Sequence, residues 1–252
     1  MRFYCLSDNP NKPCYIVQFK QVSLMLDCAL DISTFQNFVP LPVVEKPNQA
    51  PVFNQDLVNN DLRDVGTSLG QPYPLVDSEP EVLPPESNLF PFCDVDAILI
   101  SNYTSMLALP FITETEAFRG KVYATEPSIL LGKIFMEEMI EYLGRTPRLH
   151  EAKMWKSLLS QLPSPLCDIQ DVKRWRKMYT KEKMEACLSK VQMVGFNEKT
   201  SIFGLIEISP VSSGYCLGSC NWLMTTGRDE NKVGWTGKPS IQFTNCLLQW
   251  RP

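Results

Sequence analysis

The sequence predicts an α/β protein built on a mixed sheet with helices packed against it. Short apolar runs typical of buried strands occupy the first thirty residues and recur at 97–100 and 121–124. A polar loop and a helical pattern follow the first of these later runs, and a longer helical pattern follows the second. The order strand, loop, helix, strand, helix is the alternation that places helices on the faces of a sheet.

The amino-terminal residues predict three strands joined by polar turns. Residues 3–6, 15–19 and 24–26 alternate between apolar and polar or run apolar. The stretches between them, at 8–11 and 20–21, are polar, as tight turns are. Because strands with such short connections pair antiparallel, we expect a meander at the start of the sheet.

The loop after residues 97–100 is the predicted functional position. In α/β sheets, ligands and catalytic groups gather just past the carboxyl end of a strand. The loop holds five uncharged residues: Asn102, Tyr103, Thr104, Ser105 and Met106. None of these side chains is a strong metal ligand or a proton-transfer group at neutral pH. A helix is expected to begin at 107–109.

The strand at 121–124 leads into a long helix. Thr125 precedes this helix, Pro127 lies in its first turn, and Gly144 ends it. The apolar residues expected on its buried face are Leu131, Phe135, Met139 and Tyr142. The residues expected to face water are Lys133, Glu137, Glu138 and Glu141. A shorter helical pattern lies within 145–165.

A basic helix is predicted over 171–190, and it admits two interpretations. Four cations surround the aromatic residues Trp175 and Tyr179: Lys173, Arg174, Arg176 and Lys177. Basic residues interleaved with aromatic ones can bind RNA through phosphate pairing and base stacking. Alternatively, an ordinary buried stripe is formed by Met184, Cys187, Leu188 and Val191. The cations on the opposite side of the helix would then form a solvated face. The acidic balance of the whole chain favours the solvated face.

A hairpin is predicted after this helix. Its strands are 191–196 and 202–208, and its turn is the polar stretch 197–199. Residues 43–91, by contrast, are rich in Pro, Asn and Asp. We expect them to form a mobile surface insertion with one short element at 75–76, acting as a solvated spacer rather than as a partner-binding segment.

The composition limits the function classes. With 252 residues, 44% of them apolar, the chain can bury a sizeable core, and its net charge of −4 gives no general attraction to nucleic acid. Nine cysteines without a C-x-x-C pair favour reduced thiols in a cytosolic or nuclear compartment. No apolar run approaches the roughly 18 residues of a membrane span, so no membrane association is expected. The single histidine, His150, cannot furnish a two-metal zinc site alone.

The residues around the predicted functional loop resemble those of the metallo-β-lactamase/β-CASP nuclease family. The steps Ile100-Ser101 and Leu109-Pro110-Phe111 are similar to the two ends of the family's metal-binding loop, and Leu26-Asp27-Cys28 is similar to its preceding Leu-Asp-Cys step. Between those ends, Asn102 and Thr104 stand where the family has its first two histidines. The family's Asp-His pair falls in a gap of this loop, which is two residues short, and Ser105 and Met106 lie beside that gap.

A second motif also retains its flanking residues but lacks its metal-binding histidine. Residues 209–219 resemble the family's third motif, in which a metal-binding histidine follows a glycine. Tyr215 occupies that position after Gly214, and a phenol that titrates near pH 10 is a poor zinc ligand. The pair Cys216 and Cys220 lacks the second pair that a structural zinc site needs.

The resemblance implies a metallo-β-lactamase-like αββα sandwich that is incomplete, because the closing strands and the β-CASP domain would follow residue 252. It assigns residues 1–222 to a partial domain, interrupted by the insertion, and 223–252 to a tail outside the family. It also implies the family's inactive branch, with no catalytic residue, metal or cofactor. Such proteins support an active paralogous endonuclease within a nuclear complex that processes small nuclear RNA 3′ ends and attenuates transcription, with the cytoplasm as a further location.

Three other interpretations stay open at this point. The basic helix 171–190 would make the chain an RNA-binding module. A diverged hydrolase would draw on four residues: Asp27, Cys28, Asp31 and His150. A truncated product would have no function of its own.

Overall fold

The chain forms two compact units. Unit 1 comprises residues 1–30, 85–136 and 179–252, and unit 2 comprises 31–84 and 137–178. A computed structural model describes residues 1–7, 9, 12–19, 22–38, 66–67, 75–76, 78–85, 88–145, 156, 172–226 and 232–236. None of the helices in these ranges combines the length and the apolar character needed to cross a membrane.

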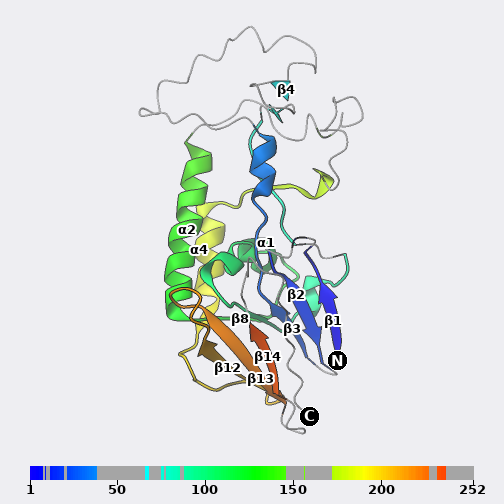
Figure 1. The fold of residues 1–252 in the computed structure, drawn as a ribbon. Coiled ribbons are helices and arrows are strands. Elements are labelled where there is room, and N and C mark those ends of the chain that lie inside the picture. The colour runs from blue at the N-terminus through cyan, green and yellow to red at the C-terminus, as the bar shows by residue number, and fades with distance from the viewer. Residues whose placement is uncertain are drawn as a thin grey trace. The chain divides into compact units, whose positions relative to one another are not determined.

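Unit 1 contains a six-stranded mixed sheet in the order β1-β2-β3-β7-β8-β10. Its strands are β1 (Arg2–Cys5), β2 (Tyr15–Gln18), β3 (Ser23–Leu26), β7 (Ala97–Leu99), β8 (Lys121–Ala124) and β10 (Val191–Met193). The first three pair antiparallel, which confirms the predicted meander. The pairs β3 with β7, β7 with β8 and β8 with β10 are parallel, so the α/β class is confirmed as well (Figure 1).

The prediction of a hairpin over 191–208 is wrong. Its first strand, β10, joins the six-stranded sheet beside β8, while β11 (Thr200–Ile202) and β12 (Ile206–Ser212) pair antiparallel elsewhere. The turn that joins β11 to β12 contains Phe203 and Gly204, whose φ angles are 51° and 69°. Positive φ at two successive residues is typical of tight hairpin turns, and Gly204 adopts it without strain.

A second, four-stranded antiparallel sheet follows the order β11-β12-β13-β14. It is completed by β13 (Cys220–Thr226), which pairs with β12, and by β14 (Lys232–Thr236), which pairs with β13 (Figure 1). The boundary expected between residues 222 and 223 falls inside β13. The first part of the expected tail therefore continues this sheet.

The two sheets of unit 1 pack face to face around an apolar core. The six-stranded sheet contributes Val17, Leu24, Leu26, Ala97, Leu99 and Tyr123. The four-stranded sheet contributes Ile202, Ile206, Ile208, Cys220, Trp222 and Met224. Both sets alternate along their strands, as residues on one face of a sheet do. This sheet-on-sheet core is the central part of the sandwich expected from the sequence.

Helices cover the other face of the six-stranded sheet. That face carries residues that are fully buried: Ile16, Met25, Ile98 and Val122. On this side lie α1 (Leu109–Thr113), α4 (Lys181–Ser189) and the first half of α2 (Glu126–Gly144), and α1 packs against α4 (Figure 1). The helices predicted to start at 107–109 and at 125–127 are both confirmed.

The predicted orientation of α2 is only partly correct. Phe135 and Tyr142, expected to be buried, are exposed. The residues on its buried side are instead Ser128, Gly132, Met136 and Leu143. A Cβ on Gly132 would overlap Sδ of Met106, so the glycine allows a close approach. The first residues on the buried side, Ser128 and Gly132, are small and not strongly apolar. The spacing of apolar residues in the sequence therefore does not reveal this side.

Unit 2 contains short elements from within the predicted insertion and from both sides of it. These are η1 (Ser33–Asn37), β4 (Gly66–Thr67), β5 (Leu75–Val76), β6 (Glu81–Val82), η8 (Val172–Arg174) and β9 (Arg176–Lys177). The short element expected at 75–76 is confirmed, and it pairs with β4. However, β6 pairs with β9 and Val82 is fully buried. The prediction of a solvated spacer is therefore wrong for the carboxyl end of the insertion. Most of residues 43–74 lie outside the described residues.

Candidate metal site and its loops

Asp27 ties the end of β3 to the end of β7. Its fully buried carboxylate accepts hydrogen bonds from the backbone N of Ser101 at 2.7 Å and from Ser101 Oγ at 2.8 Å. Its own backbone N donates to Leu99 O at 2.9 Å. The φ of Asp27 is 61°, a left-handed conformation that Asp adopts more readily than most residues. This carboxylate therefore has a structural role.

Asn102 holds the functional loop closed. Its Oδ1 accepts from Thr104 N at 3.0 Å, Ser105 N at 3.1 Å and Thr104 Oγ1 at 2.6 Å. Its Nδ2 donates to Ser101 Oγ at 3.2 Å. The amide thus caps the short helix η5 (Tyr103–Met106), a role for which Asn is well suited. The side chain at the first histidine position is bonded within its own loop.

The rest of the loop also serves the scaffold. Ser105 O accepts from Cys28 N at 2.7 Å, and Cys28 O accepts from Ala108 N at 3.0 Å. Met106 is fully buried against α2 at Gly132. Tyr103 packs edge-on against Phe135, with ring centroids 6.1 Å apart. These contacts fix the loop between β3, α1 and α2.

The loop 213–219, which resembles the third motif, is anchored to the start of α2. Gly218 O accepts from Thr125 Oγ1 at 2.5 Å and from Ser128 Oγ at 3.0 Å. Gly218 has a φ of 80°, and a Cβ there would lie 2.7 Å from Ser128 N. Only glycine fits this position. Tyr215, by contrast, is 47% exposed, so its side chain is not enclosed in a buried site.

The two sheets meet at the functional loop. The backbone N of Cys220, at the start of β13, donates to Ser101 O at 2.8 Å. Trp222 Nε1 donates to Ile100 O at 3.1 Å. These bonds bring the predicted positions Asp27, Asn102 and the 213–219 loop to one end of the sheets. The local sequence pattern does not indicate that Ser101 and Trp222 connect the two sheets.

Three cysteines far apart in the sequence, Cys14, Cys28 and Cys187, are buried and interact with one another. The alternation of β2 places Cys14 on the same face as Ile16, toward the helices, where Cys28 and Cys187 are also fully buried. Burial, followed by a hydrogen bond with Cys14, raises the pKa of the Cys28 thiol. Burial also raises the pKa of Cys187 to about 12. The thiols of Cys28 and Cys187 therefore stay protonated at neutral pH, and a protonated thiol is a weak metal ligand.

The prediction of one continuous basic helix over 171–190 is wrong. The segment forms η8, β9 and, after Thr180 as the amino-terminal cap, α4. Arg176 and Lys177 are extended because β9 pairs with β6. Arg176 Nη1 donates to Lys173 O at 2.7 Å, and Lys177 pairs with Glu79 at 2.8 Å. Part of the cationic charge is therefore already engaged within unit 2.

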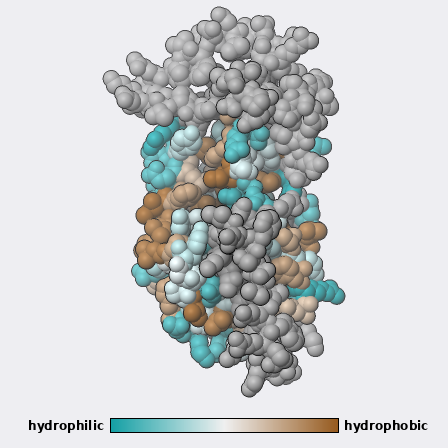
Figure 2. Space-filling view, viewed as in Figure 1, coloured by the Kyte–Doolittle hydropathy of each residue, from teal (hydrophilic) through white to brown (hydrophobic). Residues whose placement is uncertain are grey.

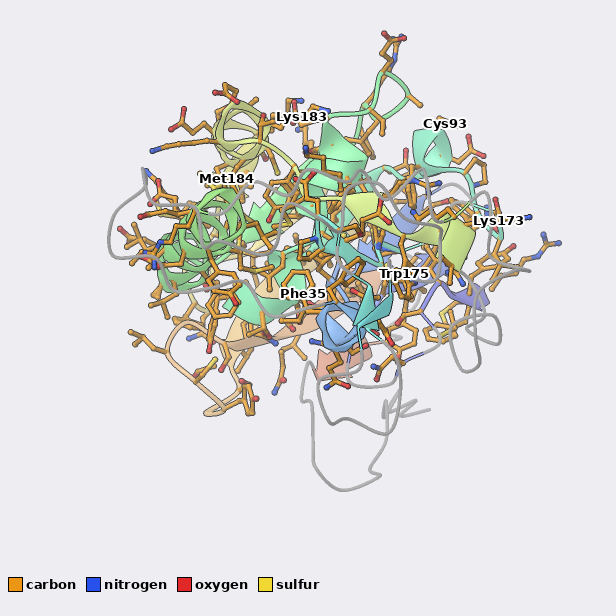
Figure 3. All side chains as sticks on the ribbon, turned by 90° about the horizontal axis from the view of Figure 1, so that it is seen from above. Phe35, Cys93, Lys173, Trp175, Lys183 and Met184 are labelled. Atoms are coloured by element: carbon orange, nitrogen blue, oxygen red, sulfur yellow. The ribbon has the colours of Figure 1, made fainter. Side chains whose placement is uncertain are left out.

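The aromatic residues of this segment are buried rather than available for base stacking. In unit 2, Trp175 packs against Phe38, with centroids 5.7 Å apart, and lies among the side chains around η1, whereas Lys173 lies toward the periphery (Figure 3). In unit 1, Tyr179 is buried against Phe111 and donates from its hydroxyl to Leu107 O at 2.9 Å. The segment thus lacks the exposed stacking surface on which the RNA interpretation depended.

The described residues do not fit the zinc ions that the fold family implies. Asn102 is already bonded within its loop, Tyr215 is half exposed, and the Asp27 carboxylate is bonded to Ser101. Within the described ranges, no three His, Cys, Asp or Glu residues are grouped so that they could hold a metal ion. The ligand atoms that zinc prefers, imidazole nitrogen and thiolate sulfur, do not converge at this position. His150 lies outside the described residues.

Replacing Asn102 with alanine is expected to lower the free energy of unfolding by about 1–2 kcal/mol, because the helix cap is lost. Chemical denaturation followed by circular dichroism measures this difference. Asn102→Asp is the matched control, since its carboxylate can still accept from Thr104 and Ser105. Equal stability of Asn102→Ala and the unmodified chain would contradict the capping role.

Comparison with known proteins agrees with this architecture. A sequence family described as the metallo-beta-lactamase superfamily domain matches residues 78–233. The Rm3 metallo-beta-lactamase structure aligns with a TM-score of 0.40 and 12% identity, covering 96% of this chain and 64% of that one, and it is too distant to bear on function.

Several curated relatives carry the name Integrator complex subunit 9. The homologue from Nematostella vectensis is 42% identical over 98% of this chain and 38% of its own length. The Homo sapiens protein is 41% identical over 97% of this chain and 37% of its own length, and the Dictyostelium discoideum homologue is 30% identical over 92% and 38%. The chain therefore spans a little over a third of the length of these relatives. The resemblance seen in the sequence is confirmed, and the chain belongs to the metallo-β-lactamase superfamily.

Proposed function

We propose that this chain acts as a non-catalytic scaffold of the Integrator subunit 9 type. In this role it supports an active metallo-β-lactamase endonuclease subunit, together with other Integrator subunits, in the nucleus. The process served is the 3′-end cleavage of small nuclear RNA and the attenuation of transcripts. The similarity to Integrator complex subunit 9 over nearly the whole chain supports the assignment to such a complex.

The observation that carries the non-catalytic role is the bonding of Asn102. A catalytic zinc site needs free ligand atoms aimed at one point and an open position for water. Oδ1 of Asn102 already accepts three hydrogen bonds from Thr104 and Ser105. Binding a cation there would break the cap that shapes the loop. We therefore assign Asn102, Thr104, Ser105 and Met106 as ligand positions that have become structural, and Tyr215 as a ligand position that is now exposed.

A hydrolase built from Asp27, Cys28, Asp31 and His150 finds less support. Asp27 is bonded to Ser101, and Asp31 Oδ1 accepts from Ser33 N at 2.9 Å. Both carboxylates therefore satisfy backbone amides. Burial raises the pKa of Cys28, so its thiol is neutral and poorly nucleophilic at pH 7.

The purified chain is expected to contain substoichiometric zinc and to leave a synthetic RNA hairpin intact. Elemental analysis by mass spectrometry measures the zinc, and gel electrophoresis of the labelled RNA measures cleavage. The double variant Asn102→His/Thr104→His shows whether restoring two imidazoles changes zinc binding. One equivalent of zinc in the unmodified chain, with cleavage that Asp27→Asn abolishes, would overturn the proposal.

The scaffold role is tested by co-purification. The chain and a full-length relative are each expressed with the active endonuclease paralogue, and recovery on a tag carried by the paralogue is compared. We expect recovery of both proteins if residues 1–252 contribute to the interface. Recovery of the full-length relative alone would place the supporting surface outside this chain.

A further inference from the structure

An exposed apolar surface runs along α2 and the loop anchored to its first turn. Leu130 and Ile134 are both 57% exposed, and Phe135 is exposed beside them. On the loop 213–219, Leu217 is 71% exposed and Tyr215 is half exposed. Figure 2 shows hydrophobic residues gathered over α2 on this face of the molecule. We name these five residues the α2 docking face.

The docking face is held rigidly. On the opposite side of α2, Ser128 and Met136 are fully buried, and Gly132 packs closely against Met106. The loop is fixed to the first turn of α2 by the bonds from Thr125 and Ser128 to Gly218 O. Leu130 and Ile134 are four residues apart, so they form the kind of ridge that fits the groove of another helix. The exposed apolar groups are therefore presented in a fixed geometry.

The charges around the ridge are mainly acidic. Glu126 precedes Leu130 by one turn and Glu138 follows Ile134 by one turn, and both are exposed. Within the described part of the chain, neither carboxylate forms an ion pair. Glu137 adds a third carboxylate, and Lys133 is the only cation between these positions. An apolar centre with acidic ends is complementary to an apolar stripe with basic ends.

A second copy of this chain does not match that pattern. Antiparallel packing of two α2 helices through their Leu130 and Ile134 ridges, centred at the level of residue 132, would place Glu126 opposite Glu138 of the copy. Like charges at close range repel. The exposed side of α4 offers no alternative, because its exposed residues are mainly charged: Lys181, Glu182, Lys183 and Glu185. The occupant must therefore bring its own cations.

We propose that the α2 docking face binds an amphipathic helix of another protein, whose leucine-like stripe packs on Leu130 and Ile134 and whose Lys or Arg residues pair with Glu126 and Glu138. Such a helix would lie in the groove beside the ridge, as amphipathic helices do in other helix-binding surfaces. Binding at the α2 docking face does not depend on whether the chain binds metal. The test of this proposal is therefore independent of the zinc measurement.

The test uses a fluorescein-labelled helical peptide with leucines at four-residue spacing and lysines at both ends of the stripe. A matched peptide carries glutamates in place of the lysines. Fluorescence anisotropy with the full chain is expected to show at least about tenfold tighter binding of the lysine peptide. The double variant Leu130→Ser/Ile134→Ser should weaken that binding by a similar factor, and Glu126→Lys/Glu138→Lys should reverse the preference between the peptides.

Leu89→Ser, which changes a similarly exposed leucine on a different segment, is the control and should bind as the unmodified chain does. Circular dichroism checks that every variant keeps its fold, as expected for exposed positions. Equal affinity for the two peptides, or unchanged binding by Leu130→Ser/Ile134→Ser, would overturn the proposal. A dimer in light scattering that this double variant dissociates would instead assign the surface to a second copy.

Discussion

Replacing Trp222 with alanine is expected to lower the free energy of unfolding by about 3–5 kcal/mol, the range for removing a large aromatic side chain from a core. Trp222 is fully buried between the two sheets, where it packs in the core with Leu99 and Ile208. Its Nε1 also donates to Ile100 O at the end of β7. The alanine variant would leave both a cavity and a carbonyl without this partner.

The variant Trp222→Phe separates these two contributions. Phenylalanine keeps most of the apolar volume but cannot donate to Ile100 O, so the expected loss is about 1–2 kcal/mol. Urea denaturation followed by circular dichroism measures both variants, since intrinsic tryptophan fluorescence changes with the substitution itself. A Trp222→Ala variant as stable as Trp222→Phe would show that the core between the sheets closes over the missing ring.

Much of the six-stranded sheet could be predicted because its signals are local. The antiparallel strands at 15–19 and 24–26 alternate or run apolar, and the strands at 97–100 and 121–124 are short apolar runs, as buried parallel strands are. The pairing of β10 could not be predicted in the same way. Residues 191–208 contain two strand-like stretches with a polar turn, and that local pattern is typical of a hairpin. The parallel pairing of β10 with β8 depends on residues far away along the chain.

The functional loop shows a similar division. Its place after β7 follows from the strand pattern, and the absence of strong ligands follows from the residue types. The capping role of Asn102 could have been suspected, because Asn commonly bonds to backbone amides two and three residues ahead. The partner of Asp27 could not, because Ser101 lies 74 residues further along the chain. Nor does apolar periodicity explain why Leu130 and Ile134 are exposed, since Gly132 decides which side of α2 is buried.

Replacing Asp27 with alanine is expected to destabilise the chain by about 3–4 kcal/mol, because a hydrogen-bonded charge is removed from a buried position. The backbone N and the hydroxyl of Ser101 would both lose their acceptor where Ser101 is fully buried. Alanine would also have to adopt the φ of 61° found at this position, which costs about 1 kcal/mol for a residue with a plain Cβ. Chemical denaturation at neutral pH measures the loss.

Two further variants at Asp27 divide this effect into its parts. Asp27→Gly also removes the acceptor but adopts positive φ freely, so it is expected to be about 1 kcal/mol more stable than Asp27→Ala. Asp27→Asn keeps an oxygen that can accept from Ser101 N and tolerates the left-handed conformation, so we expect a loss of about 1–2 kcal/mol. If Asn, Gly and Ala were equally destabilising, the carboxylate charge itself would be responsible. The order Asn above Gly above Ala instead assigns the stability to the link between β3 and β7, which places the functional loop.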